Sequence, residues 1–430
     1  MMKAKVITLG CKVNQYESEA MLSSLLQHGF AAAEDKETAD VVILNSCTVT
    51  AESDRKVRQI FRRAKKDNPD AVMVLTGCMA QAFPEDARRL EEADIILGTS
   101  NRKRLVPDLL AFLSARQRII DIAPHTNDEK FENLNVENFT GRTRAFVKIE
   151  DGCNRFCSYC IIPYARGRVR SKPLEDLKAE LAGLGANGYK EVGLTGINLS
   201  AYGQEFGLHL CDAIEAACAT PGIERVRLGS LEPEQLSEDV IRRMAKQKKL
   251  CPQFHLSLQS GCDATLKRMN RHYTADEYRT IVRNLRAAFE NAAITTDIMV
   301  GFAGETDEEF AESLAFAEEI AFAKVHVFAY SRRPGTRAYD MGDQLTNAVK
   351  EARSHEMIRV TTATQQAFFK AQIGRTEEVL FEREIQKGVW EGYSMNYTPV
   401  AVASGTSLAG EIRSVRIESC TDTHCMGAVL

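Results

Sequence analysis

Residues 151–167 read DGCNRFCSYCIIPYARG and hold three cysteines in a tight group, Cys153, Cys157 and Cys160. Three thiolates can bind three irons of a four-iron cluster and leave the fourth iron open to a ligand other than protein. The alternative is a structural zinc site, which normally needs four ligands, often as two separated C-x2-C pairs. Only one such pair occurs here, and no matching pair follows at the usual spacing. The stretch therefore favours an iron–sulfur cluster with one open corner.

Six strand-like segments, separated by helical ones, begin at this stretch and continue to residue 330. Six strand–helix repeats are too few for a closed eight-fold barrel, but they predict an open, partial (β/α)6 barrel. The tight group follows the first segment. The segments are AFVKIEDG (145–152), EVGLTGIN (191–198), RVRLGS (225–230), FHLSLQSG (254–261), ITTDIMVGF (294–302) and KVHVFAY (324–330).

A second, spread group of cysteines lies nearer the N-terminus, where VITLGC, VVILNSC and VMVLTGC end in Cys11, Cys47 and Cys78. Each run is apolar, of strand length and rich in Val or Ile, and the intervals suit a strand, a crossover helix and the next strand. Parallel strand ends gather on one edge of an open sheet, where ligands bind. A single cysteine is normally a small buried hydrophobe. Three at the same strand-end position predict a second cluster with three protein ligands.

The N-terminal domain is expected to be an open parallel α/β domain that spans residues 1–137. A fourth apolar run, ADIILGTSN (93–101), ends without cysteine, so three ligands is the expected count. The following segment, residues 124–144, is polar, Asn-rich and aperiodic, which is typical of a linker or a functional loop. We therefore place a domain boundary near residue 138 and assign residues 138–370 to the partial barrel.

After a helical segment that ends near Lys370, residues 371–430 alternate between polar and apolar side chains in short runs. This pattern predicts a small β-barrel. Such barrels often bind nucleic acid, but Gly374 to Leu430 contains five basic and eight acidic residues. Net charge therefore gives an RNA-binding role for this barrel no support. His424 and Cys425 are expected to lie in a loose terminus.

Composition indicates a reducing, cytoplasmic location without a membrane segment. Twelve cysteines in 430 residues are too few for a disulfide scaffold, and no signal peptide or apolar run of membrane length occurs. The net charge of −4 excludes a polycation. The strongest basic run, Arg55 to Lys66, has seven positive residues in twelve. It suits either a solvated helix face or a face that contacts phosphate beside the spread group.

These motifs together resemble the radical S-adenosylmethionine (SAM) methylthiotransferases. C-x3-C-x2-C after the first strand of a six-fold barrel resembles radical SAM enzymes in general. TLGCKVNQYESEA, the NSC and TGC strand ends, GCNRFCSYCIIPYARGRVRS, HLSLQSG, GFAGETDEEF and FAYSRRPGT resemble the methylthiotransferases, whose terminal barrel is of the TRAM type. The resemblance covers essentially the whole chain.

Within that family, GCKVN and CIIPYARGRVRS are most similar to the tRNA branch that acts on N6-threonylcarbamoyladenosine beside the anticodon. Two other branches act on isopentenyladenosine in tRNA and on an aspartate of a ribosomal protein, and they remain alternatives. One departure is Ala303, which stands where the family has proline in Phe-Pro-Gly-Glu-Thr. This change loosens a turn, but Gly304 and Glu305 remain.

The resemblance implies two 4Fe-4S clusters and two uses of SAM. An aromatic C–H has no acidic proton and no leaving group, so the reaction needs a radical. The tight cluster would bind SAM at its open iron and cleave it to a 5′-deoxyadenosyl radical. The spread cluster would carry a sulfur, receive a methyl group from a second SAM and deliver methylthio to C2 of the adenine. An electron donor and a sulfur source are implied as partners, beside SAM and the tRNA anticodon loop.

The resemblance also suggests roles for several other residues. Tyr159 would pack near the SAM adenine, although a core aromatic is the alternative. Thr195, Gly196 and Asn198 end the second barrel strand, where family members hold the methionine amino group. Gln259, with Ser260 and Gly261 after it, ends another strand and is expected to contact cofactor.

Five further side chains are candidates for contacts with substrate or SAM. Arg166, Arg168 and Arg170 follow the cluster loop and could meet SAM carboxylate, RNA phosphate or the carboxylate of threonylcarbamoyladenosine; an exposed solvated arm is the alternative. Tyr330 and Arg333 are expected at the substrate mouth.

Two function classes compete with this interpretation. A zinc-dependent RNA-binding module without catalysis is disfavoured because a second tight cysteine pair is missing. An iron–sulfur assembly or electron-transfer protein would leave the barrel-strand ends after Cys160 with no substrate to serve.

Overall fold

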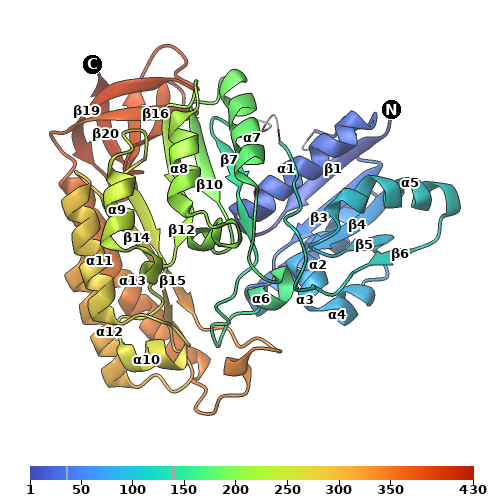
Figure 1. Cartoon of the computed structure of the whole chain (residues 1–430), viewed down its shortest axis with the longest axis horizontal. Coiled ribbons are helices and arrows are strands. Elements are labelled where there is room, and N and C mark those ends of the chain that lie inside the picture. Colours follow the sequence, from blue (N-terminus) through green and yellow to red (C-terminus); the bar gives the residue numbers. More distant parts are fainter. Residues whose placement is uncertain (35–36, 137–138, 140–141) are drawn as a thin grey trace.

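The computed structural model describes residues 1–34, 37–136, 139 and 142–430. The chain is mixed α/β, as predicted, with parallel sheets in its first two parts and a closed barrel of five strands at its C-terminal end. In Figure 1 the N-terminal α/β unit (blue) lies along the side of the central unit, and the C-terminal barrel (red) lies over one end of it. The predicted boundary between residues 137 and 138 falls outside the described residues.

The N-terminal unit is a six-stranded parallel sheet with the strand order β2-β1-β3-β4-β5-β6. Its elements are β1 (Lys3–Thr8), α1 (Lys12–Gln27), β2 (Ala31–Ala32), β3 (Val41–Ser46), α2 (Ala51–Asp67), β4 (Val72–Gly77), α3 (Cys78–Ala82), α4 (Pro84–Arg88), β5 (Ile95–Leu97), η1 (Arg102–Arg104), α5 (Leu105–Ala115) and β6 (Ile119–Asp121).

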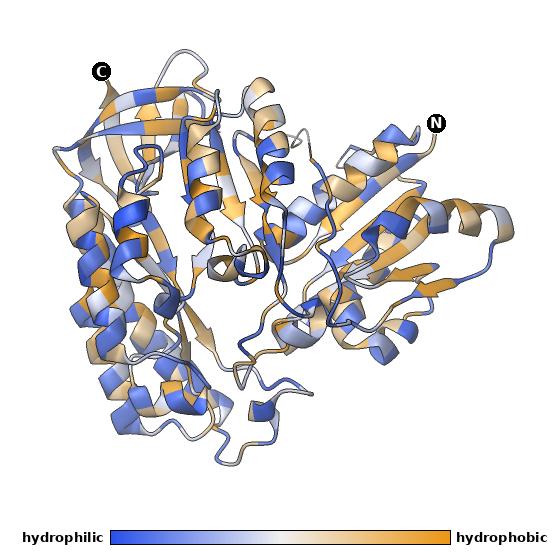
Figure 2. Ribbon diagram, viewed as in Figure 1, coloured by the Kyte–Doolittle hydropathy of each residue, from blue (hydrophilic) through white to orange (hydrophobic). Residues whose placement is uncertain are grey.

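The central strands of this sheet are apolar along their whole length because both faces are covered. Every residue of β3 and β4 is buried. Successive side chains point to opposite faces, and Val42 and Leu44 pack into one apolar cluster while Val41 and Ile43 pack into the other. Figure 2 shows these strands as largely hydrophobic ribbons between mixed helices. This double burial explains the continuous apolar runs that precede Cys47 and Cys78.

The basic run Arg55 to Lys66 lies on α2, whose apolar stripe of Val57, Phe61 and Ala64 is buried. Most of its cations point outward, and several pair with nearby carboxylates such as Glu52 and Glu92. The helix therefore has a solvated basic face, and its contact with phosphate stays a prediction.

The central unit is the open, partial barrel that the sequence predicts, built from parallel sheets of order β11-β10-β7 and β12-β13-β14-β15. Its strands are β7 (Ala145–Lys148), β8 (Glu150–Asp151), β9 (Arg170–Ser171), β10 (Glu191–Thr195), β11 (Arg225–Leu228), β12 (Ser230–Leu231), β13 (Gln253–Leu256), β14 (Ala293–Val300) and β15 (Lys324–Ala329). Its helices are α6 (Ile162–Arg166), α7 (Leu174–Ala186), η2 (Leu199–Ala201), η3 (Gln204–Phe206), α8 (Leu210–Ala219), η4 (Pro233–Gln235), α9 (Glu238–Ala245), α10 (Asp263–Arg268), α11 (Ala275–Ala288), α12 (Asp307–Ile320), η5 (Arg337–Tyr339) and α13 (Asn347–Lys370).

The C-terminal barrel closes in the order β16-β17-β18-β20-β19. Its strands are β16 (Thr376–Gln386), β17 (Val389–Ser394), β18 (Pro399–Ala403), β19 (Ile412–Cys420) and β20 (Cys425–Val429). The expectation of a loose terminus at His424 and Cys425 was wrong, because Cys425 is buried and begins the strand that pairs with both β18 and β19. The short tail gives little periodic signal, yet without it the barrel would stay open.

Arginines of β11 hold this barrel against the central unit. Arg225 donates to the carbonyl oxygens of Tyr393 (3.1 Å) and Glu378 (2.7 Å), and Arg227 donates to those of Met395 (2.8 Å) and Ser394 (2.7 Å). Within the described residues, none of the helices combines the length and the apolar composition needed to cross a bilayer.

Candidate active site

The spread cysteines follow the carboxyl ends of three adjacent parallel strands, β1, β3 and β4. Cys11 immediately precedes α1, Cys47 directly follows β3, and Cys78 begins α3. A Cβ on Gly10 would lie only 3.0 Å from Cys47 Cβ and 3.3 Å from its Sγ, at a φ of 118° that favours glycine. Gly10 therefore lets the first loop pass close to the second, and the sheet brings the three cysteines to one edge.

The three thiols differ in their exposure: Cys78 is buried, Cys47 is half-buried and Cys11 is exposed. Burial raises the pKa of Cys78 to about 12, although the Arg166 guanidinium acts in the opposite direction. Burial also raises the pKa of Cys47, and the neighbouring Cys11 adds to that rise. A bound metal reverses this preference because coordination deprotonates a thiol. Cys47 and Cys78 therefore favour the neutral thiol in the metal-free chain.

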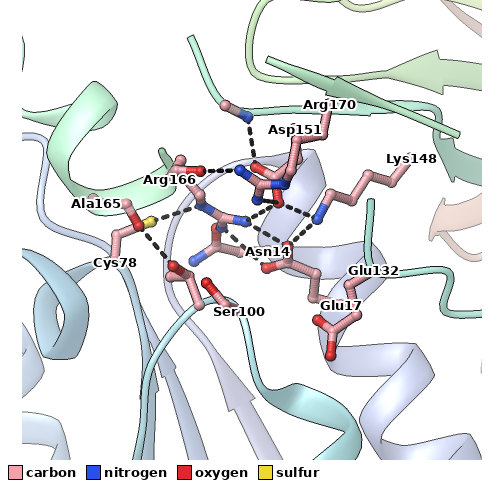
Figure 3. Close-up of polar contacts among 12 residues, drawn as sticks. Asn14, Glu17, Cys78, Ser100, Glu132, Lys148, Asp151, Ala165, Arg166 and Arg170 are labelled. Carbon is pink, nitrogen blue, oxygen red and sulfur yellow. Dashed lines mark hydrogen bonds and ion pairs between the residues drawn. The ribbon is translucent and has the colours of Figure 1, made fainter. Parts of the chain in front are cut away.

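Arg166, from α6 of the central unit, reaches across to this edge (Figure 3). Its Nε donates to Cys78 Sγ at 3.2 Å and its Nη2 donates to Asn14 Oδ1 at 2.7 Å. Asn14 in turn donates to the carbonyl oxygens of Leu9 and Ser46, both at 3.0 Å, so it ties the loops before Cys11 and Cys47 together. Arg166 is fully buried, and it therefore belongs to the wall of the spread group.

Glu17, on α1, forms ion pairs with three cationic side chains that lie between the two cysteine groups. Its carboxylate pairs with Arg102 Nη2 at 2.9 Å, with Lys148 Nζ at 2.7 Å and with Arg166. Burial alone would raise the pKa of Glu17, but Arg102, Arg166 and Lys148 lower it to about 2. Asp151 pairs with Lys148 at 2.5 Å and lies two residues before Cys153. One ionic network therefore connects the helix that follows Cys11 with the loop of the tight group.

Arg166, Arg168 and Arg170 were candidates for contact with SAM, phosphate or a substrate carboxylate. Arg170 is also buried, and it pairs with Asp151 at 3.4 Å and donates to the carbonyl oxygen of Arg166 at 2.7 Å. Arg168 is exposed and lies over the Phe156 ring, 4.8 Å from its centroid. Two of the three arginines are thus occupied by protein groups, and only Arg168 faces solvent.

The tight group lies in the loop that follows β8. Gly152 has a φ of 85°, and a Cβ there would lie 2.0 Å from the carbonyl oxygen of Arg168. Cys153 N donates to the carbonyl oxygen of Gly167 at 3.0 Å, and Cys160 N donates to that of Cys157 at 2.9 Å. Burial raises the pKa of Cys160 to about 12 and raises the pKa of Cys153 well above its ordinary value. Arg271 Nη1 donates to Cys157 Sγ at 3.3 Å.

The donors in both places suit iron clusters better than single ions. No set of three or more His, Cys, Asp or Glu in the described part of the chain is placed to hold one metal ion. A single zinc ion holds its sulfur ligands at about 2.3 Å, which draws them close together, whereas a four-iron cluster binds each thiolate through a different iron. Three soft thiolate donors on one loop, or on one sheet edge, therefore fit the predicted clusters.

Several predicted cofactor residues surround the tight loop. Thr195 ends β10, and a Cβ on Gly196 would lie 2.6 Å from Glu150 Oε2. Asn198 N donates to that same oxygen at 2.7 Å. Among the described residues, Glu150 Oε1 and Asn198 Oδ1 are buried without a hydrogen-bond partner. Burial raises the pKa of Glu150 well above its ordinary value, and an ammonium group would lower it again. These two unpartnered acceptor oxygens therefore suit the amino group of SAM, which donates hydrogen bonds.

The remaining candidates are part of the protein's own packing. The Tyr159 and Phe302 rings lie 6.4 Å apart at 79°. Tyr330 is buried against Phe302, with their ring centroids 5.0 Å apart, and buried Arg333 pairs with Asp54 at 2.7 Å. Tyr330 and Arg333 therefore lie inside the protein.

Gln259 has a φ of 71° and joins β14 through backbone hydrogen bonds to Asp297 and Met299. Ser260 caps Cys262 N, and Gly261 N donates to Ser313 Oγ at 2.9 Å. These contacts support the strand end. The turn at Ala303 is also held without proline, because Glu305 accepts from Gly301 N at 2.7 Å.

A cavity of about 460 Å³ opens between the spread group and the inside of the partial barrel. Cys11, Lys12 and Val13 line one side, and Thr195 and Gly196 line the other. The deeper wall comes from β13, β14 and β15, with Gln253, His255, Thr295, Lys324 and His326. This cavity therefore borders both the exposed cysteine of the spread group and the strand end at Thr195.

The cavity is cationic. Lys12 and Lys324 have no ion-pair partner among the residues described, whereas His255 Nε2 lies 3.3 Å from Asp297 Oδ2. Desolvation of the Lys12 ammonium in the recess between the units lowers its pKa to about 8, and Arg144 and Arg227 add to this effect. An anionic group on a ligand would therefore find two ammonium groups ready to bind it.

A partial barrel with a C-x3-C-x2-C loop after its first strand defines a radical SAM enzyme. A model described as the Radical SAM superfamily matches residues 147–317, and one described as Uncharacterized protein family UPF0004 matches residues 3–98. The solved structure of the radical SAM methyltransferase TsrM from Kitasatospora setae has a similar fold, with a TM-score of 0.57 and 14% identity over 78% of this chain and 74% of that chain.

Curated relatives are closer in sequence. The threonylcarbamoyladenosine tRNA methylthiotransferase MtaB of Bacillus subtilis is 36% identical over 95% of this chain and 92% of its own length. The tRNA-2-methylthio-N(6)-dimethylallyladenosine synthase of Pelotomaculum thermopropionicum is 35% identical over 99% of this chain and 97% of its own length. The chain belongs to the radical SAM tRNA methylthiotransferase family, whose members are transferases that use SAM and two 4Fe-4S clusters.

Proposed function

We propose that the chain methylthiolates C2 of N6-threonylcarbamoyladenosine next to the anticodon of tRNA, with SAM as both the methyl donor and the radical source. The observation that carries this proposal is the cationic cavity beside Cys11. The threonylcarbamoyl group adds a carboxylate to the adenine, whereas an isopentenyl group adds only apolar carbon. Lys12 and Lys324, which lack carboxylate partners among the described residues, suit the first substrate.

The names of relatives alone do not choose between the two tRNA substrates. The relatives named for threonylcarbamoyladenosine and for dimethylallyladenosine differ by only one percentage point in identity to this chain. The charge of the substrate distinguishes the two candidates more sharply than these names do. A hydrogen bond from a lysine to the carboxylate of the threonylcarbamoyl group would contribute about 1.5–3 kcal/mol. An apolar substituent would desolvate the lysines without replacing their water.

The six cysteines are proposed as the cluster ligands. Cys11, Cys47 and Cys78 would bind one cluster, and Cys153, Cys157 and Cys160 the other. When bound, the clusters and SAM supply the radical chemistry and the methylthio group that an aromatic C–H requires. Glu150 and Asn198, each with a buried oxygen that has no hydrogen-bond partner among the described residues, would accept from the SAM amino group beside Thr195 and Gly196. Tyr159 and Gln259 would support the cofactor from its surrounding shell.

Three domains are proposed to divide the work: an α/β domain at residues 1–137, the partial barrel at 138–370 and a TRAM-like barrel at 371–430. The reaction also requires an electron donor and a sulfur source from outside the chain. We place the activity in the cytoplasm, where tRNA is modified.

The test compares two anticodon stem-loop RNAs that carry either threonylcarbamoyladenosine or isopentenyladenosine. We expect methylthio product with the first and little with the second, measured by mass spectrometry of nucleosides. Lys324→Gln should lower kcat/KM for the first RNA by about 10- to 150-fold, the equivalent of about 1.5–3 kcal/mol. Lys178→Gln, at an exposed lysine on α7, is the matched control.

Equal modification of both RNAs would contradict the substrate assignment. So would a strain that lacks the gene and keeps all its methylthiolated threonylcarbamoyladenosine. Either result would leave the radical chemistry standing.

A further inference from the structure

A second cavity, of about 600 Å³, lies where all three parts of the chain meet. Lys12 comes from α1, Arg142 and Phe146 from the start of the partial barrel, and Arg383, Tyr393 and Tyr397 from the C-terminal barrel. Lys12 and Tyr397 also line the cavity beside Cys11. The two cavities are therefore neighbours that share a wall.

Aromatic rings form one surface of this second cavity. The Tyr393 and Tyr397 rings are stacked, with centroids 4.6 Å apart and planes at 19°. The Arg144 guanidinium lies 5.0 Å from each centroid, and the Lys12 ammonium lies 5.4 Å from the centroid of Phe146. Tyr397 is partly exposed and has a φ of 69°, which is costly for a bulky side chain and is concentrated at functional sites.

Cations surround these rings, and they come from different parts of the sequence. Arg142 and Arg383 stand at the rim with partly exposed side chains. Glu382, which pairs with Arg144, is the acidic residue of the wall. Four cations thus face one carboxylate, although the C-terminal barrel as a whole has an excess of acidic residues. The net charge of that barrel gives an RNA contact no support, but the assembled surface is basic.

We propose that this second cavity binds a single-stranded nucleotide of the RNA that flanks the target adenosine. The base packs against the parts of Tyr397 and Phe146 that line the cavity, beside the Tyr393 and Arg227 groups that already contact the Tyr397 ring, and its phosphates contact Arg142 and Arg383. Bases stack on aromatic side chains in single-stranded sites regardless of sequence, and a positive groove follows the backbone. The wall that Lys12 and Tyr397 share between the two cavities then sets the distance between two consecutive nucleotides. The target adenosine occupies the cavity beside Cys11, and the flanking nucleotide occupies the second cavity. This inference rests on the RNA substrate of the proposed function and not on its threonylcarbamoyl group.

Binding of a fluorescent anticodon stem-loop RNA to the cluster-loaded protein tests the proposal by anisotropy across several salt concentrations. Tyr397→Ala should weaken binding by about 5- to 150-fold, the range for the loss of one stacked base. Tyr397→Phe, which keeps the ring, should bind as the wild type does. Loss of binding in Tyr397→Phe, or unchanged binding in Tyr397→Ala, would overturn the stacking contact.

The arginine contact has a matched control on the same barrel. Arg383 and Arg413 are both exposed and each pairs with one glutamate, but only Arg383 lines the cavity. Arg383→Gln should reduce the slope of log K against log salt by about 0.7, the value for one phosphate on a single strand. Arg413→Gln should leave the slope unchanged. Equal slopes in the two variants would overturn the phosphate contact.

The same titrations with unmodified RNA separate this proposal from the substrate assignment. If the cavity binds a flanking nucleotide, Tyr397→Ala should weaken RNA binding by the same factor whether or not the RNA carries the threonylcarbamoyl group. A loss seen only with modified RNA would overturn the site and would indicate that Tyr397 acts on the modified base itself.

Discussion

Each of the two cysteine groups presents three thiols, but the chain brings them together in different ways. The tight group occupies one short loop, with local backbone hydrogen bonds and Arg271 beside Cys157. The spread group is assembled by strand order, and Arg166 of the central unit contacts its most buried thiol. The first site depends on a few consecutive residues, and the second depends on the docking of two units.

The comparison shows that both cysteine groups lie beside one ionic network, the Glu17 network, but that different substitutions are expected to affect each group. The Glu17 network lies between them and joins α1 to Lys148 and Arg166. A change in the network reaches the spread edge through Arg166, which also contacts Cys78.

The largest expected effect comes from two single substitutions, one in each cysteine group, which test whether the groups have separate roles. Cys157→Ala should abolish both the methylthio product and 5′-deoxyadenosine, because the tight group is assigned to SAM cleavage. Cys47→Ala should abolish the product but keep some uncoupled cleavage. Both compounds are measured by liquid chromatography and mass spectrometry. Equal loss of cleavage in two folded variants, as judged by circular dichroism, would contradict separate roles.

Iron content gives the next largest effect. Anaerobic reconstitution should give about eight irons per chain, as expected for two four-iron clusters. Changing Cys11, Cys47 and Cys78 together to Ala should remove about half of this iron. Cys218→Ala, at a buried cysteine outside both groups, should remove none. Unchanged iron in the triple variant would make the spread group structural.

Glu17→Gln tests the shared support. It removes the buried carboxylate that Arg102, Lys148 and Arg166 share, so we expect a loss of about 3–5 kcal/mol in the free energy of unfolding. Glu52→Gln, which removes an exposed ion pair on α2, should cost less than about 1 kcal/mol. Urea denaturation measures both values. Equal values would show that the network contributes no more than a surface pair.

The pH dependence of the same variant provides the smallest effect. The pKa of Glu17 is about 2 in the folded chain and about 4.3 in an unfolded chain. Its contribution is therefore fully present above the unfolded value and is lost as the pH falls toward the folded value. The difference in unfolding free energy between the metal-free wild type and Glu17→Gln should become smaller as the pH falls from 6 to 3. A constant difference would contradict the lowered pKa.

Strand ends were predictable from the sequence because they depend on local pattern. The apolar runs before Cys11, Cys47 and Cys78 need only a parallel sheet to bring them together. The roles of Arg166 and Arg170 were not predictable, since their partners Glu17 and Asp151 meet them through tertiary docking. Charged residues inside AFVKIEDG were the available signal, because a lysine in a buried strand needs a partner.

The two cavities were hidden for the same reason. Lys12 begins α1, and its neighbours Tyr397 and Lys324 come from distant segments. Composition of one segment cannot describe a surface to which three segments contribute. The basic rim around Tyr397 is the clearest example, since most of its charge lies outside the C-terminal barrel.

The graded exposure of the spread group has a consequence for the lifetime of the enzyme in air. Cys11 is the exposed member and lines the cavity in which the proposed function places the adenosine. Oxidation of cysteine follows access, so we expect oxidants to reach Cys11 before the other two thiols of this group. In the proposed complex the RNA would cover this opening, so turnover and protection would depend on the same occupancy.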